Sequence, residues 1–406
     1  MDSPSELLAK YPLLVDWHSH QGSQDMNKLT CSLDSGEYTC AVTSNRQYTN
    51  SNLTQAILFY GTDVSLKDLP LPRQRHHVWS LMHEESPKNN ILFSFKGIME
   101  LFNFTSTFRR ESDLPLTTQY VRSVEQLESI QFLKSFQEKE RFIEEENIAP
   151  IVYVQGDCDV PSDRDHFVTM MTKHIKIDSY GGCLHNKNLP AHLTDPVGGM
   201  THVDFLELIS KYKFAISMEN GICQDYITEK YWRPLVVGTI PIVLGSPAIA
   251  DFYPSNASVI NVENFTSIKQ LVESIQTISS DKEKYNMYRS FKRKGGVTNG
   301  YLRKILEERE WEPDTDVQLN FNRIKPNFPH VYSCRVCEML HNIKDKGSTY
   351  QASIKHYGCP WPTEFIDENN LKAKQPFSDM WHALWMQTQE EVEKFLHSTK
   401  GGRVRP

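Results

Sequence analysis

The sequence contains no long hydrophobic run and no excess of basic residues. No window approaches the roughly 20 apolar residues of a membrane-spanning helix. Residues 1–17 have neither the basic start nor the long apolar centre of a signal peptide. With a formal net charge of -7, the chain has no positive surplus for a nucleic-acid backbone, and we expect no nucleic-acid partner. Either the protein is cytosolic, or a membrane anchor is missing from this chain.

Internal repeats and low-complexity stretches are also absent. Of the 406 residues, 39% are hydrophobic and 23% are charged, which is the balance of a globular protein with a sizeable core. This length predicts two domains. The eight cysteines leave two alternatives open, namely disulfides formed in an oxidising compartment and free thiols in the cytosol.

The order of predicted elements indicates where the domains begin and end. We expect strands over 56–61 and 98–104 and one charged surface helix over 124–148, which together place a first domain at 1–148. A second domain, 149–310, alternates strands with helices. Its predicted strands are 151–155, 175–180, 213–218, 240–245 and 258–262, and its predicted helices are 164–174, 202–212, 226–237 and 267–278. Residues 311–406 form a C-terminal segment with a helical tail.

Alternation of this kind predicts an α/β fold with a doubly wound parallel sheet, whose ligands bind beyond the carboxyl ends of the strands. The stretch "SMENGICQDYITEKYWRPLVVGTIPIVLG" (217–245) lies at such an end. Asp225 is a candidate N-cap for the next helix, whose start, with Lys230, favours an anion. Glu219 and Glu229 are good acceptors for sugar hydroxyls. The pattern suggests a nucleotide carrying a sugar, although ordinary helix capping explains it equally well.

The same stretch resembles the signature of the α-1,3-fucosyltransferases of glycosyltransferase family 10, with Met218 in place of the usual Phe. The motifs "HEESP" (83–87) and "LFNFTSTFRRESDLPL" (101–116) follow the family's order, and the likeness covers 57–337. "FYGTD", "HEESPKNN" and "DSYGGCLHNKNLP" are most similar to a divergent animal subgroup, the α-1,3-fucosyltransferases ten and eleven.

This resemblance implies a GT-B fold, in which two Rossmann-like domains face each other across a cleft and the second domain binds GDP-fucose. The implied reaction inverts the anomeric centre, with Glu85 of the Glu-Ser-Pro motif as the catalytic base and Glu84 as its neighbour. Enzymes of this kind generally work without a metal, so we expect no metal site and no cofactor besides the donor substrate.

The resemblance also implies roles for the donor-binding residues. Arg164 and Lys230 match diphosphate-binding positions, and Glu229 matches an acid that accepts hydrogen bonds from ribose hydroxyls. Asn220 and Tyr226 are expected in the same pocket. Glu219 is expected to contact the fucose or to orient Lys230.

Cysteine pairing is a further implication of the resemblance. It implies bridges from Cys31 to Cys334 and from Cys40 to Cys337, so that disulfides staple the C-terminal segment to the N-terminal region. Elimination then suggests Cys158 with Cys223 and Cys183 with Cys359. We expect the helical tail to pack through four apolar residues, Met380, Leu384, Trp385 and Phe395. Four glycosylation sequons occur, at Asn52, Asn103, Asn256 and Asn264, of which about three are expected by chance.

Three alternatives for the activity stay open. The subgroup implies transfer of fucose to Ser or Thr of folded EMI-type domains of secretory proteins. The wider family implies α-1,3-fucosylation of N-acetylglucosamine in N-glycans. A protein that keeps the fold but only binds glycans or glycoproteins is the third. The resemblance implies a glycoprotein partner and the lumen of the endoplasmic reticulum or Golgi, with membrane attachment only through an anchor that this chain lacks.

Overall fold

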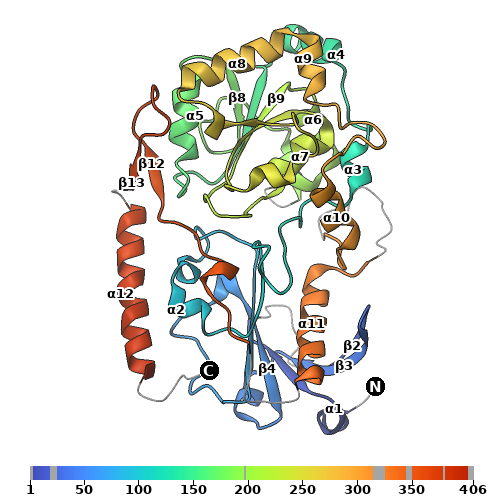
Figure 1. Cartoon of the computed structure of the whole chain (residues 1–406), viewed down its shortest axis with the longest axis vertical. Coiled ribbons are helices and arrows are strands. Elements are labelled where there is room, and N and C mark those ends of the chain that lie inside the picture. The colour runs from blue at the N-terminus through green and yellow to red at the C-terminus, as the bar shows by residue number, and fades with distance from the viewer. Residues whose placement is uncertain are drawn as a thin grey trace. The chain divides into compact units, whose positions relative to one another are not determined.

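The computed structural model describes residues 3–18, 25–195, 198–313, 325–343, 350–377 and 380–400. The chain divides into two compact units, each built around its own largely parallel sheet (Figure 1). Unit 1 comprises Met1–Thr117, Pro326–Pro360 and His382–Pro406, and unit 2 comprises Thr118–Lys325 and Trp361–Trp381. The α/β class expected from the sequence is confirmed.

The domain boundary differs from the one expected at 148. Residues 118–148 belong to unit 2, because Val124 and Leu127 pack in one core cluster with Trp232. Residues 311–406 do not form a separate segment either, since they are shared between the two units. The sequence pattern could not show this, because the apolar positions of a short helix do not reveal which body they pack against.

Unit 1 contains a six-stranded sheet in the order β2-β3-β1-β4-β5-β6. Its strands are β1 (Leu13–Asp16), β2 (Asn27–Leu33), β3 (Gly36–Thr43), β4 (Thr54–Tyr60), β5 (Val78–His83) and β6 (Phe104–Thr107). β2 and β3 form an antiparallel hairpin that turns at Gly36, whose φ of 137° suits glycine. The remaining pairs are parallel, so the carboxyl ends of β4, β5 and β6 lie at one edge.

The strand expected over 98–104 is wrong. This stretch contains the end of α2 (Lys96–Met99) and a turn, and β6 begins only at Phe104. Ile98 and Met99 are fully buried, so the stretch is apolar for reasons of packing and not of strand pairing. A short apolar run does not distinguish these cases.

Two helices from the C-terminal part of the chain belong largely to unit 1. α11 (Phe328–Asn342) is bonded to the β2–β3 hairpin by the disulfides Cys31–Cys334 and Cys40–Cys337, as expected. In α12 (Met380–Lys400), the ring of Trp385 packs 5.4 Å from that of Phe95. The packing face of α12 was partly misassigned, because Met380 and Leu384 are exposed and Trp381, Trp385 and Val392 are buried.

Unit 2 contains a five-stranded sheet, entirely parallel, in the order β11-β10-β9-β7-β8. Its strands are β7 (Ile151–Val154), β8 (Ile177–Tyr180), β9 (Phe214–Met218), β10 (Ile240–Leu244) and β11 (Ile260–Asn261), close to the expected ranges. From β7 the chain builds the sheet first on one side and then on the other. The switch point therefore lies between β7 and β9, and a crevice forms there at the carboxyl ends of the strands.

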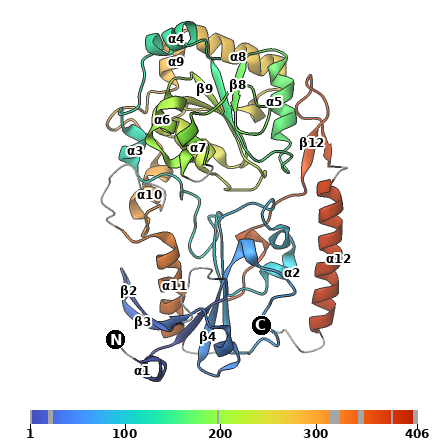
Figure 2. The ribbon, with the colours of Figure 1, turned by 180° about the vertical axis from the view of Figure 1, so that it is seen from behind.

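Helices cover both faces of this sheet, as the two views show (Figures 1 and 2). α5 (Arg164–Thr172) and α8 (Ile268–Ser280) share one core cluster with the sheet. α6 (Val203–Ser210) and α7 (Glu229–Val237) pack in the clusters of the other face. This is the doubly wound arrangement that the sequence predicts.

The single helix expected over 124–148 is two helices, α3 (Val124–Glu128) and α4 (Phe136–Glu145). Each begins after a serine N-cap, and Ser135 forms a capping box with Glu138. The remaining elements are α1 (Pro4–Lys10), α9 (Lys282–Met287), α10 (Gly300–Glu308), β12 (Thr363–Phe365) and β13 (Lys374–Pro376). Among the residues described, no helix has the length and hydrophobicity that a bilayer crossing requires.

Candidate functional site

A cavity of about 500 Å³ opens in unit 2 at the carboxyl ends of β7, β8 and β9. Its polar wall includes Gln155 and Asp157 after β7, Gly181 and Gly182 after β8, and Asn220 after β9. Its apolar lining includes Val154, Leu193, Phe205, Ile209 and Pro234. A ligand with one apolar or aromatic part and one polar part suits such a cavity.

Arg164 lines this cavity and is only 1% exposed. Its guanidinium donates to two carbonyl oxygens, that of Met218 at 3.3 Å and that of Asp157 at 2.7 Å. Its Nε is buried and has no hydrogen-bond partner among the described residues. Carbonyl oxygens orient the guanidinium without neutralising it, and a buried charge without an ionic partner favours an anionic ligand.

Lys230 lines the same cavity beside Glu229. Its Nζ lies 3.0 Å from Oε1 of Glu229, 3.2 Å from Oγ1 of Thr228 and 4.0 Å from Oε2 of Glu219. Arg233, one helical turn beyond Glu229, lies 3.8 Å from the same carboxylate. Burial acts to raise the pKa of Glu229, but Lys230 and Arg233 outweigh it and lower the pKa to about 2. Glu229 is therefore a carboxylate at neutral pH.

Glu219 is buried and does not line the cavity. It accepts hydrogen bonds from the backbone N and the Oγ1 of Thr228, each at 2.7 Å. Thr228 in turn is the N-cap of α7 and accepts from the backbone N of Lys230. Of the two roles expected for Glu219, these contacts favour orienting Lys230. Asp225 is not the N-cap, since α7 begins three residues later than its position required and Asp225 has a left-handed φ of 64°.

Of the other two residues expected to bind the donor substrate, one lines the cavity and one does not. Asn220 lines the cavity. Tyr226 does not line it and is buried in the interior. The cavity therefore brings together four of the six residues expected to bind a donor: Arg164, Asn220, Glu229 and Lys230.

Sequence reasoning missed several cavity residues. Arg233 follows Glu229 at the i,i+4 spacing of an intrahelical ion pair, a signal that could have identified it. Asp-x-Asp spacing, which can present two carboxylates to a divalent cation, occurs twice after β7, at Asp157/Asp159 on the loop and at Asp163/Asp165 across the start of α5. The expectation of no metal did not take these pairs into account.

The contacts of these aspartates are largely internal. Both carboxylate oxygens of Asp165 are bonded, one to the hydroxyl of Tyr153 at 2.6 Å and one to the backbone N of Asp159. In the described part of the chain, just one group of three potential metal ligands contains no disulfide-bonded cysteine: His192, His202 and Asp204. It lies at the surface, where Nε2 of His192 is 2.8 Å from Oδ2 of Asp204.

In unit 1, the expected base and its neighbour follow β5. Glu84 Oε1 accepts a hydrogen bond from the hydroxyl of Tyr60 at 2.8 Å, and Glu84 Oε2 is enclosed without a partner among the described residues. Burial raises the pKa of Glu84 above its ordinary value, and the charge of Glu85 adds to this. Glu85 is partly exposed, and its backbone carbonyl accepts from the hydroxyl of Tyr357 at 3.0 Å.

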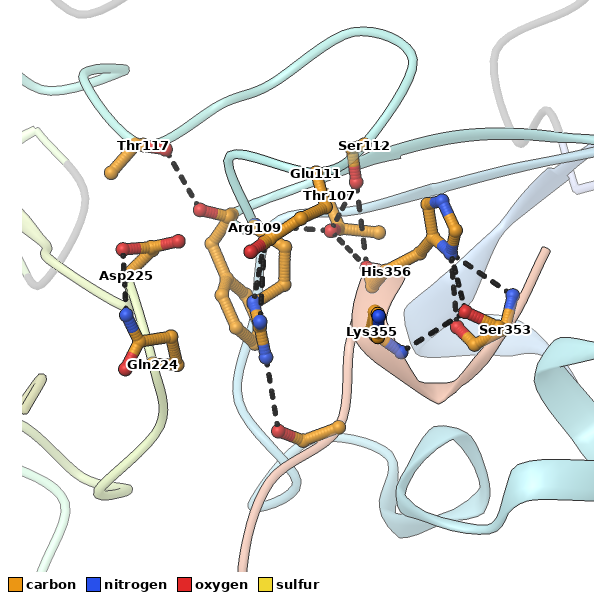
Figure 3. Close-up of polar contacts among 12 residues, drawn as sticks. Thr107, Arg109, Glu111, Ser112, Thr117, Gln224, Asp225, Ser353, Lys355 and His356 are labelled. Atoms are coloured by element: carbon orange, nitrogen blue, oxygen red, sulfur yellow. Dashed lines mark hydrogen bonds and ion pairs between the residues drawn. The ribbon is translucent and has the colours of Figure 1, made fainter. Parts of the chain in front are cut away.

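The "RRESD" stretch after β6 is tied to residues 353–358 of the same unit (Figure 3). Oγ1 of Thr107 donates to the carbonyl of His356 at 2.5 Å and lies 2.7 Å from Oγ of Ser112. Arg109 bonds Glu111 through Nε at 3.1 Å and also reaches the carbonyl of Gly358. These bonds show that much of this motif maintains the structure of unit 1.

Two further expectations are corrected. Cys158 pairs with Cys183, so both pairings suggested by elimination are wrong; Cys223 and Cys359 are also disulfide-bonded. Asn103 is 1% exposed, and its amide donates to the carbonyl of Tyr350 at 3.0 Å, so it cannot carry a glycan in this fold. The other three sequon asparagines, Asn52, Asn256 and Asn264, are exposed.

Comparison with known proteins matches two family models to this chain. "Glycosyltransferase family 10 (fucosyltransferase) C-term" matches residues 145–356, and "Fucosyltransferase, N-terminal" matches residues 9–120. A similar relative is GDP-fucose protein O-fucosyltransferase 3 of Gallus gallus, 40% identical over 388 residues, with 94% of this chain and 78% of the relative covered.

The Homo sapiens protein of the same name is 39% identical over 394 residues, with coverages of 95% and 79%. A crystal structure of an alpha1,3-fucosyltransferase with GDP-fucose is 16% identical, with a TM-score of 0.40 and coverages of 65% and 81%.

Proposed function

Because the chain belongs to glycosyltransferase family 10, the fucosyltransferases, we propose that it transfers L-fucose from GDP-fucose to a hydroxyl of a protein acceptor. The observation that carries this proposal is the convergence of Arg164, Asn220, Glu229 and Lys230 on one cavity at the switch point of unit 2. Such a crevice is where doubly wound sheets bind nucleotides.

The cavity's residues suit the parts of GDP-fucose. Its apolar lining takes the guanine ring, and the carboxylate of Glu229 accepts hydrogen bonds from the ribose hydroxyls. Arg164 and Lys230 bind the diphosphate, Arg164 through its forked donors and Lys230 as a point charge. In the transfer step the acceptor oxygen bonds to the anomeric carbon while the bond from that carbon to the diphosphate breaks. The two cations then stabilise the negative charge that develops on departing GDP.

Glu85 is the catalytic base of this proposal and takes the proton of the acceptor hydroxyl. The contacts of Glu84 support this choice, because one of its carboxylate oxygens is bonded to Tyr60 and the other is enclosed.

We propose Ser or Thr of folded EMI-type domains as the acceptor. The relatives named as protein O-fucosyltransferases support a protein acceptor, and the subgroup resemblance supports the EMI type. The disulfides support an oxidising compartment, and we propose the lumen of the endoplasmic reticulum or Golgi.

A fucose-transfer assay tests this function. Purified protein is incubated with GDP-fucose and either a folded EMI domain or an N-glycan with terminal N-acetylglucosamine, and product is detected by mass spectrometry. We expect fucose on the EMI domain, at least a 100-fold loss in Glu85→Gln, and near-normal activity in the exposed control Glu100→Gln. Transfer to the N-glycan alone contradicts the proposed acceptor. Binding of GDP without transfer to either acceptor favours a non-catalytic binder.

Metal dependence is tested in the same assay. We propose that Arg164 and Lys230 neutralise the diphosphate without a divalent cation, so activity should persist in excess EDTA. Loss of activity in EDTA with recovery on adding Mg²⁺ or Mn²⁺ would instead assign a cation to the aspartates of the β7–α5 loop.

A further inference from the structure

The disulfide Cys158–Cys183 joins two loops at the carboxyl edge of the unit 2 sheet. Cys158 lies on the loop from β7 to α5, and Cys183 lies on the loop after β8. Their Cα atoms are 5.5 Å apart, and 25 residues separate them in the sequence. The neighbouring strands β7 and β8 pair in parallel, so each loop begins beside the other.

Residues next to both cysteines line the donor cavity. Gly156 and Asp157 precede Cys158, and Gly181 and Gly182 precede Cys183; all four belong to the cavity wall. The bridge is therefore one residue away from the cavity on each side. Beyond the strand ends two backbone hydrogen bonds still join the loops, from the N–H of Gln155 to the carbonyl of Tyr180 at 3.1 Å and from the N–H of Cys183 to the carbonyl of Gln155 at 3.0 Å. The bridge adds a covalent link beside these bonds, at Cys158, which lies further along its loop.

The loop of Cys158 also positions a charged group of the site. The carbonyl of Asp157, immediately before Cys158, accepts the 2.7 Å hydrogen bond from the guanidinium of Arg164. Immediately after it, the backbone N of Asp159 donates to Asp165, the second residue of α5. Any displacement of Cys158 therefore moves the carbonyl that orients Arg164.

Glycines leave room at this wall and give its backbone conformational freedom. Gly181 has φ of 86°, and a Cβ there would lie 2.4 Å from the carbonyl oxygen of Gln155. Glycine lets the two backbones approach closely and leaves the ligand room, but it has more conformational freedom than any other residue. A cross-link beside the glycines limits that freedom before the ligand arrives, which is how preorganisation raises affinity.

We propose that the Cys158–Cys183 disulfide is a positioning element of the donor site, which holds the two glycine-containing loops and Arg164 ready for the diphosphate of a nucleoside diphosphate sugar. This inference rests on the proposed function. It assigns the disulfide a role in binding GDP-fucose, distinct from the general stabilisation given by the Cys31–Cys334 bridge of unit 1.

The test compares GDP binding by isothermal titration calorimetry in wild type, Cys158→Ala/Cys183→Ala and the control Cys31→Ala/Cys334→Ala. We expect the first pair to raise the Kd for GDP and the KM for GDP-fucose about tenfold, with kcat at saturating donor changed less than about twofold. The control pair should lower the thermal midpoint and leave the Kd for GDP unchanged.

A second variant keeps the bridge but uncouples it from the cavity, by insertion of one glycine between Asp157 and Cys158. It should weaken GDP binding to a similar extent, and it carries the test if the double variant does not fold. Wild-type affinity in both variants overturns the inference and leaves the proposed function standing. A wild-type protein that binds no GDP overturns the proposed function itself.

Discussion

Glu219 holds Thr228 through both of its carboxylate oxygens. Oε1 accepts from the backbone N of Thr228 and Oε2 accepts from its hydroxyl, each at 2.7 Å. Glu219 follows β9 and Thr228 caps α7, so this buried pair ties the end of a strand to the start of the helix that carries Glu229 and Lys230. Glu229 and Lys230 are thus positioned by a carboxylate that does not itself line the cavity.

Removing the Glu219 carboxylate should weaken both folding and donor binding. In Glu219→Ala, the buried N–H and hydroxyl of Thr228 lose their acceptors, which should cost about 2–3 kcal/mol of unfolding free energy. The Kd for GDP should rise, because Lys230 loses its support. Urea unfolding and calorimetric titration with GDP measure the two effects.

The matched control for this change is Glu273→Ala on α8, whose carboxylate is 62% exposed and lies 4.0 Å from Lys269. Its unfolding free energy should stay within about 0.5 kcal/mol of wild type. Equal stability of Glu219→Ala and this control would contradict the role given to Glu219.

The unfolding free energy should decrease as the pH rises, because the pKa of Glu219 is higher in the folded state than in the unfolded state. Burial, with a contribution from Glu229, outweighs the charge of Lys230 and raises the pKa of Glu219 from 4.5 to about 6. Between these values the folded state binds more protons than the unfolded state, so the unfolding free energy decreases as the pH rises, by about 2 kcal/mol from this group.

Urea unfolding at intervals from pH 4 to pH 7 checks this dependence. Glutamine does not ionise, so the difference in unfolding free energy between wild type and Glu219→Gln should change across pH 4.5–6 in favour of the variant. A difference that is constant with pH would contradict the raised pKa.

Asn103 should remain unmodified when the protein is produced in a secretory host. Its carbonyl oxygen accepts from Arg73 and from the backbone N of Trp79, and its amide donates to Tyr350, so all its groups are engaged inside the fold. Glycopeptide mass spectrometry should find glycans only among the exposed sequons Asn52, Asn256 and Asn264. A glycan on Asn103 of the folded, active protein would contradict this environment.

The disulfides of unit 1 should stabilise the protein strongly. The bridges Cys31–Cys334 and Cys40–Cys337 span 303 and 297 residues. Loop-entropy models assign a cross-link of this length about 5 kcal/mol, before any strain. Replacing all four of these cysteines by alanine should therefore lower the urea midpoint markedly, and an unchanged midpoint would mean that α11 docks without a covalent link.

The sequence predicted most of unit 2, because its strands and helices alternate with clear periods and its charged residues follow β9. The pattern indicated Glu229 and Lys230, and the family resemblance added Arg164 and Asn220; the cavity brings these four residues together. The bridges Cys31–Cys334 and Cys40–Cys337 were implied correctly by the family resemblance. The local sequence pattern could not have shown them, because it does not relate residues that lie about 300 positions apart.

Other features depended on tertiary contacts that the sequence does not encode locally. Cys158 meets Cys183 because β7 and β8 are neighbours in the sheet, and elimination cannot reveal such a neighbour. Tyr226 is polar at one end only, so its burial could not be read from its position in a charged motif. Asn103 belongs to a sequon, but it is buried among core residues, and the sequon alone does not reveal this burial.

Calorimetric titration of GDP into wild type, Arg164→Ala, Lys230→Ala and the exposed control Arg141→Ala tests the central claim most directly. The claim is that two cations, the buried Arg164 and the partly buried Lys230, bind one diphosphate. We expect each cavity substitution to raise the Kd for GDP at least tenfold, to affect guanosine binding much less, and the control to match wild type. GDP affinity that stays at the wild-type level in both Arg164→Ala and Lys230→Ala would contradict this account of the site.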